Sequence, residues 1–177
     1  KQLRTIADER GWLMEILRRD ETELLPKFGQ VYVSATYPGV VKGWHYHKKQ
    51  VDNFACVAGM VKLVLVDTRE DSPTNGLVNE FFIGSLNPML VQVPSLVYHG
   101  WKCISTEPWL VVNVPGEPYD REAPDEFGLE LDPEALTPCR AHWGQECRRS
   151  CLMRGADSPP GLRNFVPLRC AMRDRRP

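Results

Sequence analysis

The stretch that decides the fold is Gly39-Val-Val-Lys-Gly-Trp-His45-Tyr-His47-Lys-Lys-Gln-Val-Asp52, which six further residues separate from Gly59. Side chains on a β-strand alternate between its two faces, so His45 and His47 should lie on one face. Asp52, five residues later, can return to this face across a slight bend. The stretch therefore predicts a strand end at which two imidazoles and a carboxylate meet.

A third histidine, His99, ends the segment Pro94-Ser-Leu-Val-Tyr-His99 and is expected at the end of another strand. Three neutral imidazoles and one carboxylate are suitable ligands for a borderline divalent metal ion. The set formed by His45, His47, Asp52 and His99 is therefore a candidate metal site. The alternative is that these histidines make structural hydrogen bonds at the mouth of a barrel.

The remaining pattern predicts short strands separated by turns rich in Gly, Pro and Asn. Residues 12–19 are the one segment compatible with a helix, and a strand followed by a turn fits them equally well. Regularly spaced short strands favour a sandwich or barrel, so we expect one all-β domain over residues 1–135. The other expected strands are 30–36, 51–57, 60–66, 80–83, 89–93 and 109–114.

The composition is that of a globular protein, with 42% hydrophobic residues, 25% charged residues and a net charge of −1. A nearly neutral chain gives no electrostatic reason to bind nucleic acid or an anionic membrane, so neither is expected as a partner. No apolar run approaches the roughly 18 residues of a membrane helix. The first residues also lack the apolar stretch of a signal peptide, so a cytoplasmic location is expected.

Residues 136–177 differ in composition from the rest of the chain. They carry nine Arg, no Lys and three acidic residues, a net charge of +6, whereas residues 1–135 carry −7. The segment has no sustained strand or helix period, and its four cysteines lack the paired CxxC spacing of a structural zinc site. We expect an irregular C-terminal tail rich in Arg, Cys and Pro, with a basic binding arm as the alternative.

The spacing Gly-x5-His-x-His-x4-Asp-x6-Gly is similar to the first cupin motif, with Asp52 in the place of the usual glutamate. Pro94 and His99 similarly match the second cupin motif, although Leu96 replaces its usual glycine. The resemblance implies a cupin-type jelly-roll barrel, also called a double-stranded β-helix, with a short N-terminal extension. It is less specific for a metal ion, because many cupins have lost theirs.

The chain also resembles the dTDP-4-dehydrorhamnose 3,5-epimerase family over about residues 7–133. The resemblance implies an epimerase or isomerase of a nucleotide-activated, dTDP-type 4-keto-6-deoxy sugar, requiring no cofactor and forming a homodimer. The segment at 8–15 and the turn at 67–76 are hard to explain as general cupin features. The matching segments are Asp8-Glu-Arg10-Gly-Trp-Leu-Met-Glu15, Phe28-Gly-Gln30 with Ser34, Gly39 to Tyr46, Asp67-x-Arg69-x-x-Ser72-Pro73-Thr74-x-Gly76, Val93 to Trp101, and Tyr119 with residues 126–133.

In the implied reaction a proton beside a ketone is removed, the enolate is held, and a proton returns to the other face. His45 is the implied base, because the pKa of imidazole lies near neutral pH. Tyr98 is the candidate acid, since strand alternation points Tyr46 away from His45. The implied substrate-binding residues are Arg10, Glu15, Gln30, Lys42, Trp44 and Tyr119, with Arg10 and Lys42 at the diphosphate.

Two catalytic groups of this family are absent from the sequence. The lysine that holds the enolate is replaced by Asp52, and the acid tyrosine falls near Val112. His47 stands where the family has glutamine, so both changes move the site toward a metal-ligand set. A divalent ion there could act as the Lewis acid. The alternatives are therefore a metal-binding cupin of other small-molecule chemistry and a sugar-binding cupin without turnover.

Overall fold

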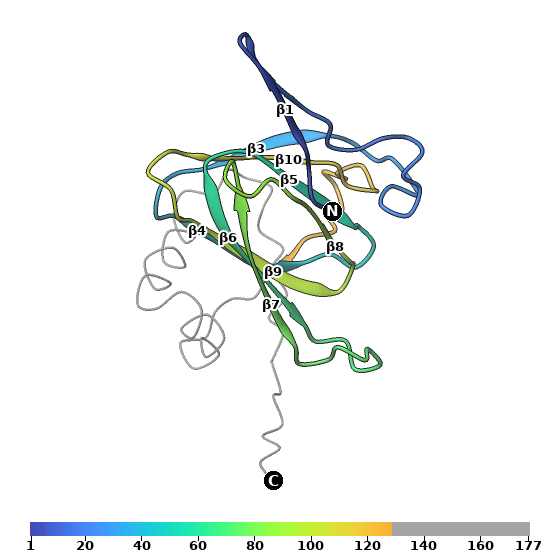
Figure 1. Cartoon of the computed structure of the whole chain (residues 1–177). Coiled ribbons are helices and arrows are strands. Elements are labelled where there is room, and N and C mark those ends of the chain that lie inside the picture. The colour runs from blue at the N-terminus through green and yellow to red at the C-terminus, as the bar shows by residue number, and fades with distance from the viewer. Residues whose placement is uncertain (129–177) are drawn as a thin grey trace.

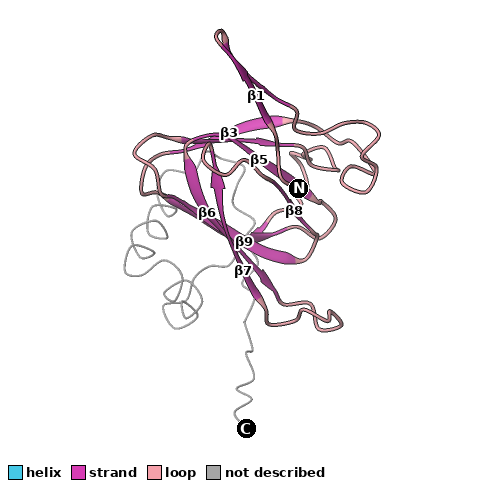
Figure 2. Cartoon of the chain, in the orientation of Figure 1, coloured by secondary structure: helices cyan, strands magenta, loops and turns pink. Residues whose placement is uncertain are grey.

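The computed structural model describes residues 1–128, which form two antiparallel β-sheets around a shared core (Figures 1 and 2). The four-stranded sheet has the order β3-β10-β5-β8, and the five-stranded sheet has the order β11-β4-β9-β6-β7. The first sheet contains β3 (Tyr32–Thr36), β10 (Trp109–Asn113), β5 (Asp52–Ala58) and β8 (Leu90–Val93). The second contains β11 (Phe127–Gly128), β4 (Val41–Tyr46), β9 (Val97–Cys103), β6 (Met60–Asp67) and β7 (Val78–Gly84).

The strand order is that of a cupin-type jelly roll, as the sequence predicts. From β3 to β11 the chain passes to the other sheet after every strand except β6, which is followed by β7 in the same sheet. The predicted strands correspond to observed ones to within about two residues at each end. The helical alternative for residues 12–19 is wrong, because Gly11–Met14 pairs as a strand with Thr5–Asp8.

The hydrophobic core lies between the two sheets and follows the strand period of two. Along β9 the side chains of Val97, Trp101 and Cys103 face inward and are buried. Trp101 contacts Phe54 of β5 and Trp109 of β10, with ring centroids 5.6 Å apart in both pairs. Each fully buried large apolar side chain of this kind stabilises the fold by about 1.5–3 kcal/mol. The core therefore fixes the ends of β4, β5, β9 and β10, which carry the candidate site.

The N-terminal extension is a hairpin of β1 (Thr5–Asp8) and β2 (Gly11–Met14) that projects from the barrel (Figure 1). Its side chains are largely exposed, including Trp12 at 58% and Leu13 at 61%. The chain before it is anchored to the barrel, since the backbone of Leu3 bonds to Pro88 and that of Lys1 to Leu90. The expected short N-terminal extension is thus a two-stranded arm.

The turn after β6 is organised by one carboxylate. Asp67 accepts hydrogen bonds from the Arg69 guanidinium at 2.7 and 2.9 Å, from the Ser72 hydroxyl at 2.6 Å and from the Thr74 hydroxyl at 2.6 Å. These contacts hold the pKa of Asp67 well below its ordinary value, with the Arg69 hydrogen bond as the main cause. The family-like turn motif therefore has a structural explanation.

Leu96, the residue at the usual glycine position of the second cupin motif, has a φ of 64°. This left-handed conformation favours glycine, and a residue with a Cβ atom adopts it at a cost. Its backbone N–H donates to the carbonyl of His47, at 2.6 Å. Leu96 is thus held in a conformation that glycine adopts more readily.

The expected domain boundary near residue 135 and the tail at 136–177 lie outside the described residues, and both stay predictions. No helix in the described part of the chain is long and apolar enough to cross a membrane.

Candidate functional site

The site is built at one end of the barrel, where strands of both sheets bring three histidines together. His45 on β4 pairs directly with His99 on β9, and their ring centroids are 4.1 Å apart. His47 lies in the loop that follows β4, with its ring 5.4 Å from that of His45. One ring nitrogen from each of the three lies within 4.8 Å of the others. The histidines singled out in the sequence are therefore neighbours in space.

Asp52, the first residue of β5, faces this histidine cluster and is buried. Its Oδ1 accepts hydrogen bonds from Gln50 Nε2 at 2.8 Å and from Asn113 Nδ2 at 2.7 Å. Its Oδ2 lies 3.2 Å from His47 Nε2 and 3.5 Å from His99 Nε2. Burial raises the pKa of Asp52, but His47, His99 and the hydrogen bond from Asn113 together outweigh it, and the net direction is down. Asp52 is thus a carboxylate placed between two imidazoles.

Backbone carbonyls determine which nitrogen of each ring faces Asp52. His99 Nδ1 lies 3.1 Å from the carbonyl oxygen of Val97, and His47 Nδ1 contacts the carbonyl oxygen of Asp125. A carbonyl oxygen only accepts hydrogen bonds, so each Nδ1 carries a proton. Both Nε2 atoms consequently point toward Asp52. This is the arrangement in which a metal-ligating histidine is usually held, with its second nitrogen bonded to a carbonyl.

The two imidazoles differ in their electrostatic surroundings. Complete burial lowers the pKa of His99 to about 4, so the ring is neutral at pH 7. Its Nε2 is buried and has no hydrogen-bond partner among the described residues. Burial also lowers the pKa of His47, but the hydrogen bond and charge of Asp52, the carbonyl of Asp125 and the charge of Glu126 together outweigh this, and the net direction is up. The neutral His99 therefore directs an unused lone pair into the site.

Asp125 fixes the loop that carries His47 and Gln50. Its carboxylate accepts three backbone N–H groups in succession, from Lys48 at 3.0 Å, Lys49 at 2.8 Å and Gln50 at 2.9 Å. Burial raises the pKa of Asp125, and these hydrogen bonds bring it below its ordinary value. Sequence reasoning missed this residue, because it lies more than 70 positions from the loop and belongs to no strand pattern.

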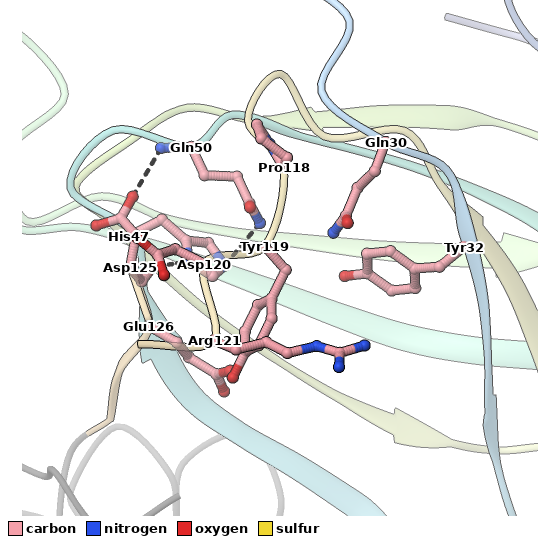
Figure 3. Close-up of a pocket in the computed structure, with 10 residues that line it drawn as sticks. All are labelled: Gln30, Tyr32, His47, Gln50, Pro118, Tyr119, Asp120, Arg121, Asp125 and Glu126. Carbon is pink, nitrogen blue, oxygen red and sulfur yellow. Dashed lines mark hydrogen bonds between the residues drawn. The ribbon is translucent and has the colours of Figure 1, made fainter. Parts of the chain in front are cut away.

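A polar pocket of about 470 Å³ opens beside His47 (Figure 3). Two of the predicted substrate-binding residues, Gln30 and Tyr119, line it. Tyr32 and Arg121 also line it, although neither was singled out in the sequence. Its polar side chains suit a ligand rich in hydroxyl groups, and Arg121 adds a guanidinium that can contact an anion.

Other predicted substrate-binding residues lie outside this pocket. Arg10 and Glu15 belong to the projecting hairpin and the chain just after it, and Arg10 pairs with Asp8. Lys42 donates from Nζ to the carbonyl oxygen of Ala35, at 2.7 Å. Trp44 is buried against Gly100, where an added Cβ atom would lie 3.4 Å from its ring. Their roles in binding stay predictions.

The predicted acid, Tyr98, lies on the other face of its sheet from the histidine cluster. It adjoins His99 on β9, and successive residues of a strand face opposite sides of the sheet. Its ring packs on that of Tyr46, with centroids 4.7 Å apart, and Tyr46 in turn stacks on Phe127 of β11. This row lies on the face of the sheet away from His45. The placement argues against Tyr98 as the acid that works with His45.

Comparisons with known proteins agree with the sequence resemblance. The family model described as dTDP-4-dehydrorhamnose 3,5-epimerase matches residues 2–139. The chain is 42% identical over 135 residues to "Probable low-salt glycan biosynthesis epimerase Agl13" of Haloferax volcanii, covering 75% of this chain and 85% of that protein. It is 37% identical over 148 residues to "Spore coat polysaccharide biosynthesis protein SpsL" of Bacillus subtilis, covering 84% and 95%. Among solved structures, a dTDP sugar isomerase from Desulfovibrio desulfuricans G20 aligns with a TM-score of 0.70 at 30% identity, covering 77% of this chain and 85% of that one.

Proposed function

Because the chain belongs to the dTDP-4-dehydrorhamnose 3,5-epimerase family, we propose that it epimerises a dTDP-linked 4-keto-6-deoxy sugar, with His45 as the base. The observation that carries this proposal is the position of His45. It lies on the inward face of β4, paired with the buried His99, in the segment that resembles the family's histidine motif. The names of two relatives refer to glycan and spore coat polysaccharide biosynthesis, which supports a reaction of this kind for the present chain.

The chemistry requires a base, a group that stabilises the enolate, and an acid. His45 removes the proton on the carbon beside the ketone, and the electron pair moves onto the ketone oxygen. A cation or a strong donor must then face that oxygen. Asp52 stands at the position of the family's lysine and carries the opposite charge. The enolate must therefore be stabilised by another group.

Our second candidate function is that of a metal-binding cupin, in which the histidine cluster holds a divalent metal ion. The donor set fits such an ion, because His47 and His99 direct Nε2 toward Asp52 and fix their N–H groups on backbone carbonyls. The buried Nε2 of His99, without a hydrogen-bond partner among residues 1–128, supports it most directly. When bound, the ion would supply a Lewis acid for the enolate oxygen. If His45 were the remaining nitrogen ligand, its coordinated lone pair could not remove a proton. The protein would then be a metal-binding cupin of other chemistry, in which His45 is not the base.

Proton exchange tests the epimerase proposal. The protein is incubated with dTDP-4-keto-6-deoxyglucose in deuterated water, and NMR follows deuterium at C3 and C5 of the sugar. We expect label at one or both carbons, and a decrease of about 10²- to 10⁴-fold in His45→Asn. Circular dichroism and thermal unfolding of the variant control for folding. Absence of label with the wild-type protein would contradict the proposal and favour a sugar-binding cupin or another substrate.

Metal analysis tests the second candidate. Protein purified without a histidine tag is examined by mass spectrometry for bound metal, before and after dialysis against a chelator. We expect about one divalent ion per chain and its loss in His99→Gln, which keeps a polar side chain of similar length. Protein that contains no metal, and whose proton exchange does not respond to added divalent ions, would exclude this role for the cluster.

A further inference from the structure

We infer that Tyr32 is the acid that returns a proton to the sugar carbon on the face opposite His45. The inference rests on the proposed epimerase function and adds a residue that the sequence comparison did not indicate. Tyr32 begins β3 in the four-stranded sheet, whereas His45 lies on β4 in the five-stranded sheet. Inversion at a carbon needs the base and the acid on opposite sides of the sugar ring, and these two residues come from the two different sheets of the barrel.

The hydrogen bonds of Asn113 fix how the Tyr32 hydroxyl is used. Asn113 is fully buried and pairs directly with Tyr32 in the register of β10 and β3. Its Oδ1 accepts the backbone N–H of Asn53 at 2.9 Å, which determines the orientation of the amide group. Its Nδ2 therefore donates both hydrogens, one to Asp52 at 2.7 Å and one to the Tyr32 hydroxyl at 2.8 Å. The Tyr32 oxygen is thus an acceptor in this contact, and its own proton remains available.

The available proton faces the pocket. Figure 3 shows the Tyr32 hydroxyl directed into the pocket, on the side where Gln30 and Tyr119 lie. Within residues 1–128 the hydroxyl donates no hydrogen bond to another residue. Burial raises the pKa of Tyr32 to about 12, so the phenol is protonated at neutral pH. The side chain is therefore an uncharged proton donor, and its position is fixed by strand β3 and by the buried amide of Asn113.

The proton balance of the step is complete. His45 takes the proton from the sugar carbon, and the electron pair forms the enolate. Tyr32 then gives its O–H proton to the same carbon from the other face, and the enolate collapses to the ketone. The transient phenolate is stabilised by the Asn113 N–H that already points at its oxygen. Exchange with water returns a proton to Tyr32 and removes one from His45.

Other tyrosines meet fewer of these requirements. Position 112, where the acid is expected from the family resemblance, is valine, and Tyr98 faces the outer side of its sheet. Tyr119 lines the same pocket, but it lies on the loop after β10 and not on a strand. Tyr32 lies across from Asn113 on β10, so it can deliver an acid from the neighbouring strand. The lost tyrosine of β10 is thus replaced from β3.

The test separates proton removal from inversion. In deuterated water the wild-type protein should give both labelled and inverted sugar. In Tyr32→Phe we expect inversion to decrease at least 100-fold, while label still enters with retained configuration, because His45 can return a deuteron to the face it attacked. Tyr37→Phe, at an exposed tyrosine on the turn after β3, is the matched control and should behave as wild type. A second variant, Tyr32→Leu, should likewise lose inversion while deuterium label still enters, so the result does not depend on one substitution.

Each other outcome contradicts the inference in a distinguishable way. Wild-type rates of inversion in Tyr32→Phe would overturn the role of Tyr32 alone. Equal losses of label and inversion in a folded Tyr32→Phe would also overturn it, since Tyr32 would then act in binding. The same separation in Tyr119→Phe, and not in Tyr32→Phe, would assign the acid to Tyr119. No label with the wild-type protein would overturn the proposed function, and this inference with it.

Discussion

Two aspartates organise the two largest polar networks described above, and they do so in opposite ways. Asp67 accepts side-chain hydrogen bonds from Arg69, Ser72 and Thr74, which all lie in the turn that follows it. Asp52 is bound by groups from a loop and from β9 and β10, as far as 61 residues away in sequence. It faces His99 Nε2, which has no hydrogen bond among residues 1–128.

The difference is the one expected between a structural network and the proposed site. Buried polar atoms are almost always hydrogen-bonded, because an unpaired one costs about 1–3 kcal/mol. The turn at Asp67 satisfies this rule locally and needs nothing from outside. The cluster at Asp52 leaves the buried Nε2 of His99 without a hydrogen bond among residues 1–128, and two of its members, His47 and Gln50, line the pocket. Such a departure is expected where a protein binds a ligand or carries out chemistry.

The largest effect on turnover is expected at Asp52, and its absence would contradict the comparison. In Asp52→Asn we expect turnover to decrease about 100-fold, since the histidines and Asn113 lose the carboxylate that orients them. The free energy of unfolding should change by less than about 1 kcal/mol, because the new amide can still bond to Gln50, Asn113 and a neutral His47. Steady-state kinetics and urea denaturation measure the two effects. A large loss of stability with normal turnover of the folded fraction would make Asp52 a structural residue like Asp67.

The matched substitution at Asp67 should have the reverse result. Asp67→Asn replaces an acceptor of charge-assisted hydrogen bonds by an amide whose NH₂ faces donors. We expect a loss of about 1–3 kcal/mol in the free energy of unfolding. Turnover per folded molecule should be unchanged, and kinetics below the unfolding temperature checks this. A selective loss of activity would show that the turn contributes to the site.

The pH dependence of stability sharpens the comparison further. The folded-state pKa of Asp67 lies below its unfolded value of about 3.9, so its contribution is full above that pH and is lost as pH falls. Wild type and Asp67→Asn should therefore differ most at pH 7. The difference should be about 1 kcal/mol smaller at pH 3, as measured by urea denaturation of both proteins. A difference that stays constant over this range would mean that the carboxylate charge is not the stabilising element.

The smallest effect is expected at Leu96. Glycine removes the cost of a positive φ, and Leu96 is 43% exposed, so little burial is lost. We expect Leu96→Gly to stabilise the fold by about 1 kcal/mol or less, measured by thermal unfolding. Leu86→Gly is the matched control at an exposed position without a positive φ, and it should destabilise. Equal destabilisation of both variants would show that Leu96 is held without strain.

Local patterns predicted the fold and part of the site. The alternation of side chains and the spacing of His45 and His47 depend on residues close in sequence and indicated a strand end of a barrel. His99 was placed beside them by its own segment, which resembles the second cupin motif. The same alternation, applied to Tyr98 beside His99, already places that tyrosine on the outer face. Asn113 and Asp125 act through contacts more than 60 residues apart, which depend on strand register and loop course. A single sequence carries no local signal for such contacts.

The strand β11 and the carboxylate of Asp125 have a consequence for the order of folding during synthesis. β11 pairs with β4 beside His45, and Asp125 holds the loop of His47 and Gln50. A ribosome makes the histidine loop some 75 residues before Asp125, when the groups that fix this loop do not yet exist. The core can collapse earlier, since the strands that form it precede residue 114. The barrel can therefore form on the nascent chain before the end that carries the histidine cluster is fixed.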